Sequence, residues 1–311
     1  MNSLRGRHFL SLQDFSLTEI AMLLDFARDL KQRQKRGEPH PLLAGKTLAM
    51  IFQKPSTRTR VSFEVGMWQL GGHALFLSSQ ELQMGRGEPI KDTAAVLSRY
   101  VDGIMIRTFK HSDVEELASF ATVPVINGLT DLLHPCQVLA DLLTVEEKLG
   151  KLAGLKLAYL GDGNNVAHSL LLGCTKVGMN IAVAGPENYW PLPEITAKAR
   201  ENAATSRCSV LITVDPLEAV KDADIIYTDV WASMGKEEEK AERKNVFAPY
   251  QVNDNILKAA RPGALVMHCL PAYRGDEITA EVLEGEQSVV IDQAENRLHA
   301  QKALLALLMG N

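Results

Sequence analysis

Short apolar runs recur along the chain, and longer amphipathic stretches separate them. The runs are apolar throughout rather than alternating, which is typical of strands buried on both faces of a parallel sheet. The predicted strands are Thr47–Phe52, Ala74–Leu77, Gly103–Ile106, Pro124–Ile126, Lys156–Leu160, Asn180–Ala184, Ser209–Val214, Asp224–Thr228, Ala264–Met267 and Val289–Ile291. Capping-box patterns at Ser16–Glu19 and Ser112–Glu115 predict two helix starts. Repeated strand–helix units predict parallel sheets covered by helices, an α/β fold.

The chain is long enough for two such domains, with 311 residues of which 46% are hydrophobic. The alternation changes near His134, where HPCQVLADLLTVEEKLG predicts a single helix. We place the domain boundary around this helix, which gives a first domain at 1–148 and a second at 149–295. The run AENRLHAQKALLALLMG predicts a last helix, and we expect its residues 296–311 to pack back on the first domain.

Charge and hydropathy argue against several classes of protein. The formal net charge of −5 disfavours a nucleic-acid-binding surface, which usually has a basic excess. No apolar run reaches the roughly 18 residues of a membrane span, and the first residues lack the apolar core of a secretory leader. The cysteines form no C-x-x-C pair; they are Cys136, Cys174, Cys208 and Cys269. We therefore expect reduced thiols in a cytoplasmic protein.

The stretch FQKPSTRTRVSFE, residues 52–64, places many hydrogen-bond donors between a predicted strand and a predicted helix. A helix start offers backbone N–H groups and the positive end of the helix dipole, which together hold an anion. The side-chain donors there are Ser56, Thr57, Arg58, Thr59 and Arg60. The competing interpretation is a capped helix whose arginines pair with carboxylates such as Glu64. A cap needs one hydroxyl, whereas guanidiniums fork onto phosphate oxygens, so we favour a phosphate site.

Further polar side chains follow the neighbouring strands. Arg107 follows one strand, and His134 precedes a helix that begins with Pro135, a usual first helical residue. Gln137 lies just inside the same helix. In a doubly wound sheet, ligands bind at the carboxyl ends of the strands, so these groups are expected to converge. Converging cations suit an acyl phosphate, where charge develops on a carbonyl oxygen and on the leaving phosphate.

The second domain offers a different set of groups. Asn164 and Asn165 follow a predicted strand at a helix start, where their amides suit a carboxylate or an ammonium. Asp229 follows another strand and could take an ammonium. A site with both kinds of group predicts an amino acid as the second ligand. The reaction class that follows is acyl or phosphoryl transfer to that amino acid.

Cofactor sites fit these residues less well. The motif GDG at 161–163 suggests a dinucleotide fingerprint, but Val166 occupies the third glycine position. Gly185 stands where a ribose-binding carboxylate is expected. Four side chains could be considered as zinc ligands: His134, Cys136, His268 and Cys269. Adjacent ligands at 268 and 269 match no common zinc spacing, so the residues favour neither a dinucleotide nor a zinc ion.

Six motifs in this order resemble the aspartate/ornithine carbamoyltransferase family, over nearly the full length from about residue 6 to 308. They are STRTR at 56–60, HPCQ at 134–137, DGNNVAHS at 162–169, DVWASMG at 229–235, HCLP at 268–271 and AENR at 294–297. SMG and HCLP point to the ornithine branch, because the aspartate branch has HPLP at the latter place. The resemblance implies two doubly wound α/β domains joined by two helices, assembled as trimers or multiples of trimers.

The resemblance also implies roles for individual residues. The residues expected to bind carbamoyl phosphate are Ser56, Thr57, Arg58, Thr59, Gln83, Arg107, His134, Gln137, Cys269, Leu270 and Arg297. Those expected to bind ornithine are Asn165, Asp229, Ser233 and Met234, and those expected to be catalytic are Arg58, Arg107, His134 and Cys269. Gln83 matches a loop position that family members lend to the neighbouring subunit's site. No metal or organic cofactor is implied.

On this resemblance we expect carbamoyl transfer from carbamoyl phosphate to the δ-amine of ornithine, a reaction of arginine metabolism. The expected partners are these small-molecule substrates, without nucleic acid or membrane. Two alternatives stay open: a carbamoyltransferase for another amine such as putrescine, and a non-catalytic amino-acid-binding protein of the same fold. Asp229 with SMG favours an α-amino acid, since putrescine has no carboxylate to recognise. The joint presence of His134, Arg107 and Cys269 argues against a binding protein.

Overall fold

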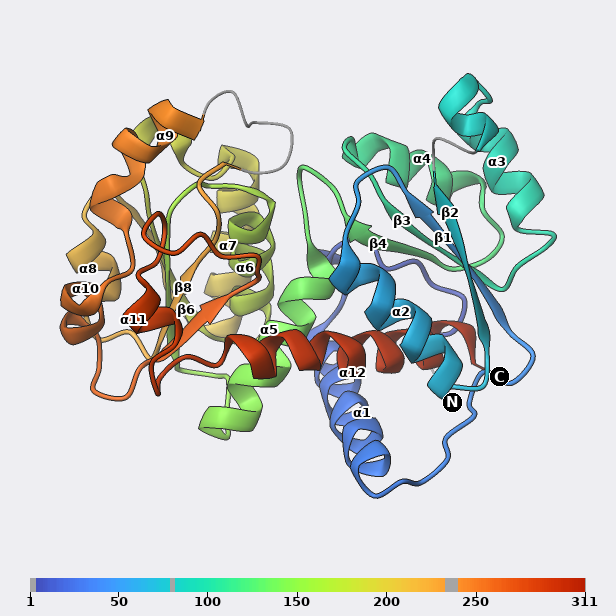
Figure 1. Ribbon diagram of the computed structural model, residues 1–311, viewed down its shortest axis with the longest axis horizontal. Coiled ribbons are helices and arrows are strands. Elements are labelled where there is room, and N and C mark those ends of the chain that lie inside the picture. Colours follow the sequence, from blue (N-terminus) through green and yellow to red (C-terminus); the bar gives the residue numbers. More distant parts are fainter. Residues whose placement is uncertain (1–3, 79–81, 233–239, 311) are drawn as a thin grey trace. The chain divides into compact units, whose positions relative to one another are not determined.

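The computed structural model describes residues 4–78, 82–232 and 240–310. The chain forms two compact units, one of Met1–Leu143 with Glu295–Asn311 and one of Thr144–Ala294. Each unit is a parallel sheet with helices packed on it (Figure 1), so the predicted α/β fold is confirmed. Helices α5 (Pro135–Leu149) and α12 (Val290–Met309) each contain residues of both units.

The first unit contains a four-stranded parallel sheet in the order β2-β1-β3-β4. Its strands are β1 (Thr47–Phe52), β2 (His73–Ser78), β3 (Gly103–Arg107) and β4 (Val125–Leu129). Met50 at the centre of β1 pairs with Phe76 of β2 on one side and with Met105 of β3 on the other. The helical elements are η1 (Leu12–Asp14), α1 (Leu17–Lys35), α2 (Thr57–Gln69), η2 (Gln83–Arg86), α3 (Ile90–Leu97) and α4 (His111–Phe120).

Alternate residues of these strands face opposite sides of the sheet. Ile51 of β1 and Ile106 of β3 belong to one buried cluster with Val114 and Leu117 of α4. The C-terminal helix α12 belongs to the same unit through its later residues. Lys302 donates to Gln34 of α1 and to Gln69 of α2, each at 2.8 Å, and Figure 1 shows α12 running beside α2 and across α1.

The second unit contains a five-stranded parallel sheet in the order β7-β6-β5-β8-β9. Its strands are β5 (Lys156–Leu160), β6 (Asn180–Ala184), β7 (Val210–Thr213), β8 (Ile225–Thr228) and β9 (Leu265–His268). The helical elements are α6 (Asn165–Lys176), η3 (Glu187–Tyr189), α7 (Pro193–Ser206), α8 (Pro216–Val220), α9 (Lys240–Phe247), η5 (Ala248–Tyr250), α10 (Asp254–Ala259) and α11 (Ala280–Leu283). Leu160, Ile226 and Val266 share a buried cluster with Val220 of α8 and Phe247 of α9.

Both sheets change winding direction at one point. In the first sheet β1 lies between β2 and β3, and in the second β5 lies between β6 and β8. The connections after the two strands at such a point leave on opposite sides of the sheet, which opens a crevice at their carboxyl ends. The crevices are therefore expected after β1 and β3 and after β5 and β8, and the groups at those places are described below.

Two local predictions were wrong. Val289–Ile291 is not a strand, because α12 begins at Val290 and only Ser288 forms a bridge to Val266 of β9. A short apolar run is compatible with either element, and here the amide of Gln293 donates to the carbonyl of Val289 and starts the helix. The capping box at Ser112 is also absent, since α4 begins at His111 without a side-chain cap. The box at Ser16 is confirmed, with both of its hydrogen bonds present.

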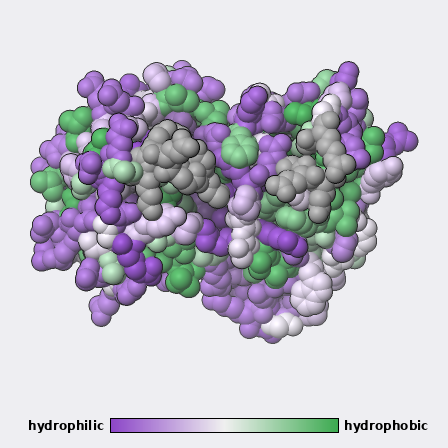
Figure 2. Space-filling view, turned by 45° about the horizontal axis from the view of Figure 1, so that its top comes forward, coloured by the Kyte–Doolittle hydropathy of each residue, from purple (hydrophilic) through white to green (hydrophobic). Residues whose placement is uncertain are grey.

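The surface adds one constraint. None of the helices among the described residues is long and apolar enough to span a membrane. On the face drawn in Figure 2, hydrophobic residues form patches between hydrophilic ones. In the first unit, exposed hydrophobic side chains of α2 and β2 include Val61, Trp68, Leu75 and Phe76.

Candidate active site

Helix α2 starts directly behind β1, and Ser56 is its N-cap. The Ser56 hydroxyl accepts from the amide of Thr59 at 3.2 Å and donates to the Thr59 hydroxyl at 3.1 Å. Thr59 is fully buried and its hydroxyl accepts from Arg297 Nη2 at 2.9 Å. The phosphate and cap interpretations of this stretch are therefore compatible, because one hydroxyl caps the helix and another fixes an arginine at its first turn.

Arg60 does not belong to this group of donors. Its Nε donates to Glu64 Oε1 at 2.9 Å, one turn along the surface of α2. Its guanidinium lies over the Phe76 ring, 3.9 Å from the centroid. The sequence analysis counted Arg60 among the phosphate donors, and that was wrong: alternate residues in the first turn of a helix point in different directions. The pairing with Glu64 that was considered as an alternative holds for Arg60.

A cluster of cationic side chains surrounds His134 at the carboxyl ends of β1, β3 and β4. Arg107 is 5% exposed, His134 4% and Arg297 3%. Burial lowers the pKa of His134 well below its usual value, and the charges of Arg297, Arg107 and Arg58 lower it further. The imidazole is therefore neutral at physiological pH, and three guanidiniums lie around it. An anion bound here would be attracted by all three charges.

Gln137 lies on the first turn of α5, three residues after His134. Its Nε2 donates to Asp141 Oδ1 at 2.8 Å, which fixes the orientation of the amide. Its Oε1 is buried and has no hydrogen-bond partner among the described residues. A buried acceptor without a partner is costly, so this oxygen is suited to an N–H donor of a ligand.

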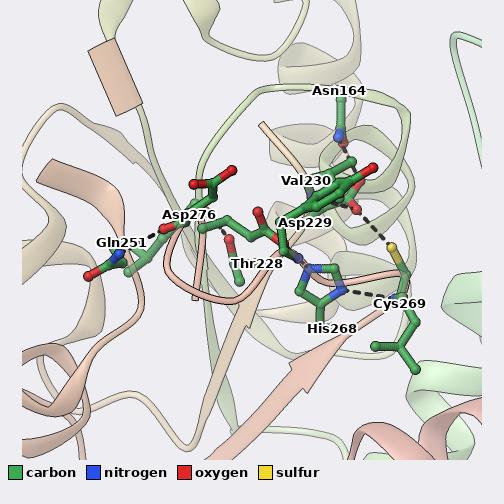
Figure 3. Close-up of polar contacts among 12 residues, drawn as sticks. Asn164, Thr228, Asp229, Val230, Gln251, His268, Cys269 and Asp276 are labelled. Atoms are coloured by element: carbon green, nitrogen blue, oxygen red, sulfur yellow. Dashed lines mark hydrogen bonds and ion pairs between the residues drawn. The ribbon is translucent and has the colours of Figure 1, made fainter. Parts of the chain in front are cut away.

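In the second unit, Asp229 at the end of β8 is the centre of a hydrogen-bonded group (Figure 3). Asn164 Nδ2 donates to Asp229 Oδ2 at 2.8 Å, and the Cys269 thiol donates to Asp229 Oδ1 at 3.0 Å. Asn164 is also the N-cap of α6, where its Oδ1 accepts from the amides of Val166 and Ala167 at 2.9 and 3.1 Å. The loop after β5 and the loops after β8 and β9 are thus joined through one carboxylate.

The carboxylates of Asp229 and Asp162 both act on the buried Tyr159 of β5. Burial raises the pKa of the Tyr159 hydroxyl well above its usual value, and the charges of Asp229 and Asp162 raise it further. A buried carboxylate in such surroundings suits a cationic ligand group. Asp162 itself accepts from Arg243 Nη1 at 2.8 Å.

Asp229, His268 and Cys269 bring one potential metal ligand each to within 4.8 Å of one another. However, both ring nitrogens of His268 are engaged. Nδ1 accepts from the Leu270 amide at 2.9 Å, and Nε2 lies 3.2 Å from Glu277 Oε1. A metal would have to replace one of these hydrogen bonds, so the ring does not fit a metal-ligand role as it stands.

The remaining expected residues fall outside these two groups or outside the description. Asn165 is the first residue of α6, directly after the N-cap Asn164. Gln83 is exposed at the start of η2. Ser233 and Met234 lie outside the described residues. The sequence analysis offered the amide of Asn164 to a ligand, but in the structure its Oδ1 caps α6 and its Nδ2 donates to Asp229.

Two family models match the chain. The carbamoyl-P binding domain of aspartate/ornithine carbamoyltransferase matches residues 7–147, and the Asp/Orn binding domain matches residues 153–308. The chain belongs to the aspartate/ornithine carbamoyltransferase family. The resemblance inferred from the motifs is confirmed.

Members of this carbamoyltransferase family with high identity match nearly the whole chain. The ornithine carbamoyltransferase of Thermococcus kodakarensis is 60% identical over 308 residues, which are 99% of this chain and 98% of that protein. The anabolic ornithine carbamoyltransferase of Pyrococcus furiosus has the same identity and coverage. A solved structure of the ornithine carbamoyltransferase from Pyrococcus furiosus superimposes with a TM-score of 0.97 at 60% identity and covers 99% of both chains. The anabolic enzyme of Campylobacter jejuni gives 0.90 at 44% identity, covering 96% of this chain and 97% of that chain.

The cationic group around His134 and the group around Asp229 fall mainly in different model matches. Arg58, Arg107 and His134 lie within the carbamoyl-P binding match, and Asp229 and Cys269 lie within the Asp/Orn binding match. Arg297 falls in the second match, although it belongs to the first compact unit and bonds to Thr59 there.

Proposed function

We propose that this chain transfers the carbamoyl group of carbamoyl phosphate to the δ-amine of L-ornithine, giving L-citrulline and phosphate. One observation carries the proposal beyond family membership: three guanidiniums surround a neutral, buried His134 at the carboxyl ends of β1, β3 and β4. Such a group suits a small anion with a polar carbonyl, and relatives at 60% identity are named ornithine carbamoyltransferase.

On the carbamoyl phosphate side, the first turn of α2 binds the phosphate. The residues proposed for this are Ser56, Thr57, Arg58 and Thr59. Backbone amides and the helix dipole add to the attraction of Arg58, and Arg297 reaches the same turn through its bond to Thr59. Arg107 and His134 bind the carbonyl oxygen, and the buried Oε1 of Gln137 accepts from the carbamoyl NH₂ group.

On the ornithine side, we assign the α-amino acid group and the amine to the loops after β5 and β8. The residues proposed to bind ornithine are Asn165, Asp229, Ser233 and Met234. Asp229 is held by Asn164 and Cys269, so its carboxylate is oriented before a substrate arrives. Cys269 and Leu270 complete the carbamoyl phosphate set, and the thiol with Asp229 orients the attacking nitrogen.

The chemistry follows from these positions. The neutral δ-amine attacks the carbonyl carbon and forms the C–N bond, and a tetrahedral intermediate with an oxyanion results. Arg58, Arg107 and His134 stabilise that oxyanion. The bond from carbon to the phosphate oxygen then breaks, and the proton lost by the nitrogen leaves with the phosphate. Holding both reactants in place supplies much of the rate, since no covalent enzyme intermediate is formed.

We further propose a homotrimer or a multiple of trimers in the cytoplasm. Helix α2, which exposes Trp68 and Val61, packs against the edge strand β2, whose Leu75 and Phe76 are also exposed. An apolar edge of this kind favours contact with another chain. The exposed Gln83 on η2 would then reach the neighbouring subunit's carbamoyl phosphate.

The experiment mixes purified protein and carbamoyl phosphate with ornithine, putrescine or aspartate in separate assays for the ureido product. Citrulline formed from ornithine alone is the expected result. Product from putrescine alone would retain the transfer chemistry and refute the amino-acid site. No product with any amine, together with measurable ornithine binding, would favour the non-catalytic binding protein.

A further inference from the structure

His268 ends β9 and is fully buried, and its ring bonds on both sides. Nδ1 accepts from the amide of Leu270 at 2.9 Å, and Nε2 lies 3.2 Å from Oε1 of Glu277, which is 1% exposed. Figure 3 shows the His268 ring beside Cys269 and Asp229. The ring therefore lies between the turn that carries the thiol and a buried carboxylate.

The partners fix the protonation state of this ring. A backbone amide can only donate, so Nδ1 must present its lone pair to Leu270. The ring proton is then on Nε2, where it is donated to Glu277. Glu277 Oε1 also accepts from the amide of Tyr273 at 2.6 Å, which holds the carboxylate in place. Glu277 thus selects the one neutral tautomer that can bind the Leu270 amide.

The turn held by this bond has an unusual backbone. Leu270 has a φ of 56°, in the left-handed region that side chains with a Cβ rarely adopt. Such a conformation persists only where the surroundings hold it. The residue before it, Cys269, directs its thiol at Asp229 Oδ1 at 3.0 Å. A change in the Leu270 turn would therefore change the direction of the thiol.

The backbone of His268 is anchored independently of its ring. Its amide donates to Gln293 Oε1 at 2.9 Å, and Gln293 Nε2 donates to the Tyr227 hydroxyl at 3.0 Å. Tyr227 lies on β8, the strand beside β9. Because the main chain of His268 is fixed to the sheet, the ring is a rigid support for the residues that follow.

We infer that His268 and Glu277 are positioning residues that hold the Leu270 turn and thereby aim the Cys269 thiol at Asp229. Neither residue contacts substrate in this proposal. Its catalytic consequence rests on the proposed function, whereas its structural consequence, the orientation of the thiol, does not. The competing explanation is that the pair only stabilises the fold of the second unit.

Two matched pairs of variants separate these explanations. His268→Asn and His268→Leu are similar in size and both lose the bond to Glu277, but only asparagine offers an acceptor to the amide two residues ahead. Glu277→Gln and Glu277→Met are also similar in size, and only glutamine keeps an acceptor for Nε2 and for the Tyr273 amide. The two variants of a pair are expected to lose similar stability. They differ in whether an acceptor remains for the Leu270 amide, in the His268 pair, or for His268 Nε2 and the Tyr273 amide, in the Glu277 pair.

The measurements are kcat, both KM values, and the alkylation rate of Cys269 by iodoacetamide, followed by peptide mass spectrometry. Cys208 is the other partly exposed cysteine, so all variants carry Cys208→Ser. Circular dichroism confirms that each variant is folded at the assay temperature. If one leucine or methionine variant does not fold, the other pair decides.

The leucine and methionine variants are expected to lose about tenfold to a hundredfold in kcat against their matched partners, with KM for carbamoyl phosphate nearly unchanged. Their alkylation rate at Cys269 should change several-fold, because the thiol no longer donates to Asp229. Equal kcat and equal alkylation within each pair would overturn the inference and leave only a stabilising role. If the parent protein makes no citrulline, the proposed function fails, and the alkylation rates still test the inference by themselves.

Discussion

The two units have the same sheet topology around their sites and opposite electrostatics within them. At the winding change of the first sheet, burial lowers the pKa of His134, and the charges of Arg297, Arg107 and Arg58 lower it further. At that of the second, burial raises the pKa of Tyr159, and the charges of Asp229 and Asp162 raise it further. The first site accumulates positive charge and the second holds one carboxylate between an amide and a thiol. The comparison teaches that topology decides where a ligand binds, whereas the residues after each strand decide its charge.

The largest expected effect tests the cationic site. Arg58→Gly should lower kcat/KM for carbamoyl phosphate by about a thousandfold, because a charge that binds both phosphate and oxyanion is removed. Arg60→Gln is the matched control, since it removes the same charge two residues later on a side chain bonded to Glu64. Its steady-state rate should stay within about twofold of the parent. Similar losses in both variants would contradict the assignment of Arg58.

The second effect tests the acidic site from the other direction. Asp229→Asn should lower kcat/KM for ornithine by about a hundredfold, because an amide attracts an ammonium far less than a carboxylate does. KM for carbamoyl phosphate should stay nearly constant. Asp254→Asn, on an exposed helix of the same unit, is the control and should leave the rates unchanged. An equal rise in both KM values would mean that Asp229 does not distinguish the two substrates.

The third effect is a difference between the two units in how strongly acid lowers their stability. Burial lowers the pKa values of four histidines of the first unit: His8, His111, His134 and His299, the last to about 4. Below the ordinary histidine value near pH 6.5 the unfolded chain binds protons that the folded unit does not, so stability falls as pH falls. His134 alone should contribute a loss of about 1 kcal/mol per pH unit below pH 6.

Intrinsic fluorescence can follow each unit during urea unfolding at pH 7.5 and at pH 5.5. Trp68 reports on the first unit, and Trp190 and Trp231 report on the second, so variants with Trp68→Phe or with Trp190→Phe and Trp231→Phe isolate each signal. The first transition should move to lower urea in acid by more than the second. An equal shift of both urea midpoints would show that the buried histidines do not make the first unit more acid-sensitive than the second.

The smallest effect concerns a helix cap in the first unit. Ser16→Ala should lower the free energy of unfolding by about 1 kcal/mol, because it removes one side of a complete capping box. Ser112→Ala is the control, since α4 begins before Ser112 and has no side-chain cap. Its effect should stay within about 0.5 kcal/mol. If Trp68 alone reports the loss from Ser16→Ala, the units unfold separately.

Strand positions were readable from the sequence because buried parallel strands are apolar along their whole length. The position of Arg107 at the end of β3 followed from that alone. Helix starts and short apolar runs were harder, because Val289–Ile291 satisfies a strand pattern and yet Val290 begins α12. The local sequence does not show whether this run pairs with β9 or forms the first turn of a helix, because that depends on the surrounding fold.

Side-chain direction was the other limit. STRTR gave two arginines at a helix start, and only the coordinates show that Arg60 bonds to Glu64. The bond from Asn164 to Asp229 joins residues far apart in sequence, so no local pattern predicts it. The same holds for His268, whose role depends on the amide of Leu270 and on Glu277. Motifs locate the loops of a site, and packing decides which side chains support it.

The bond between Arg297 and Thr59 has a consequence for how the protein is made. The two residues are 238 positions apart, and the whole second unit lies between them. During synthesis the chain emerges from its N-terminus at about 5 to 20 residues per second. Many seconds therefore pass between the synthesis of the first sheet and the synthesis of Arg297, which completes the anion site of the first unit. A nascent chain cannot assemble that site before Arg297, which follows the second unit, has left the ribosome.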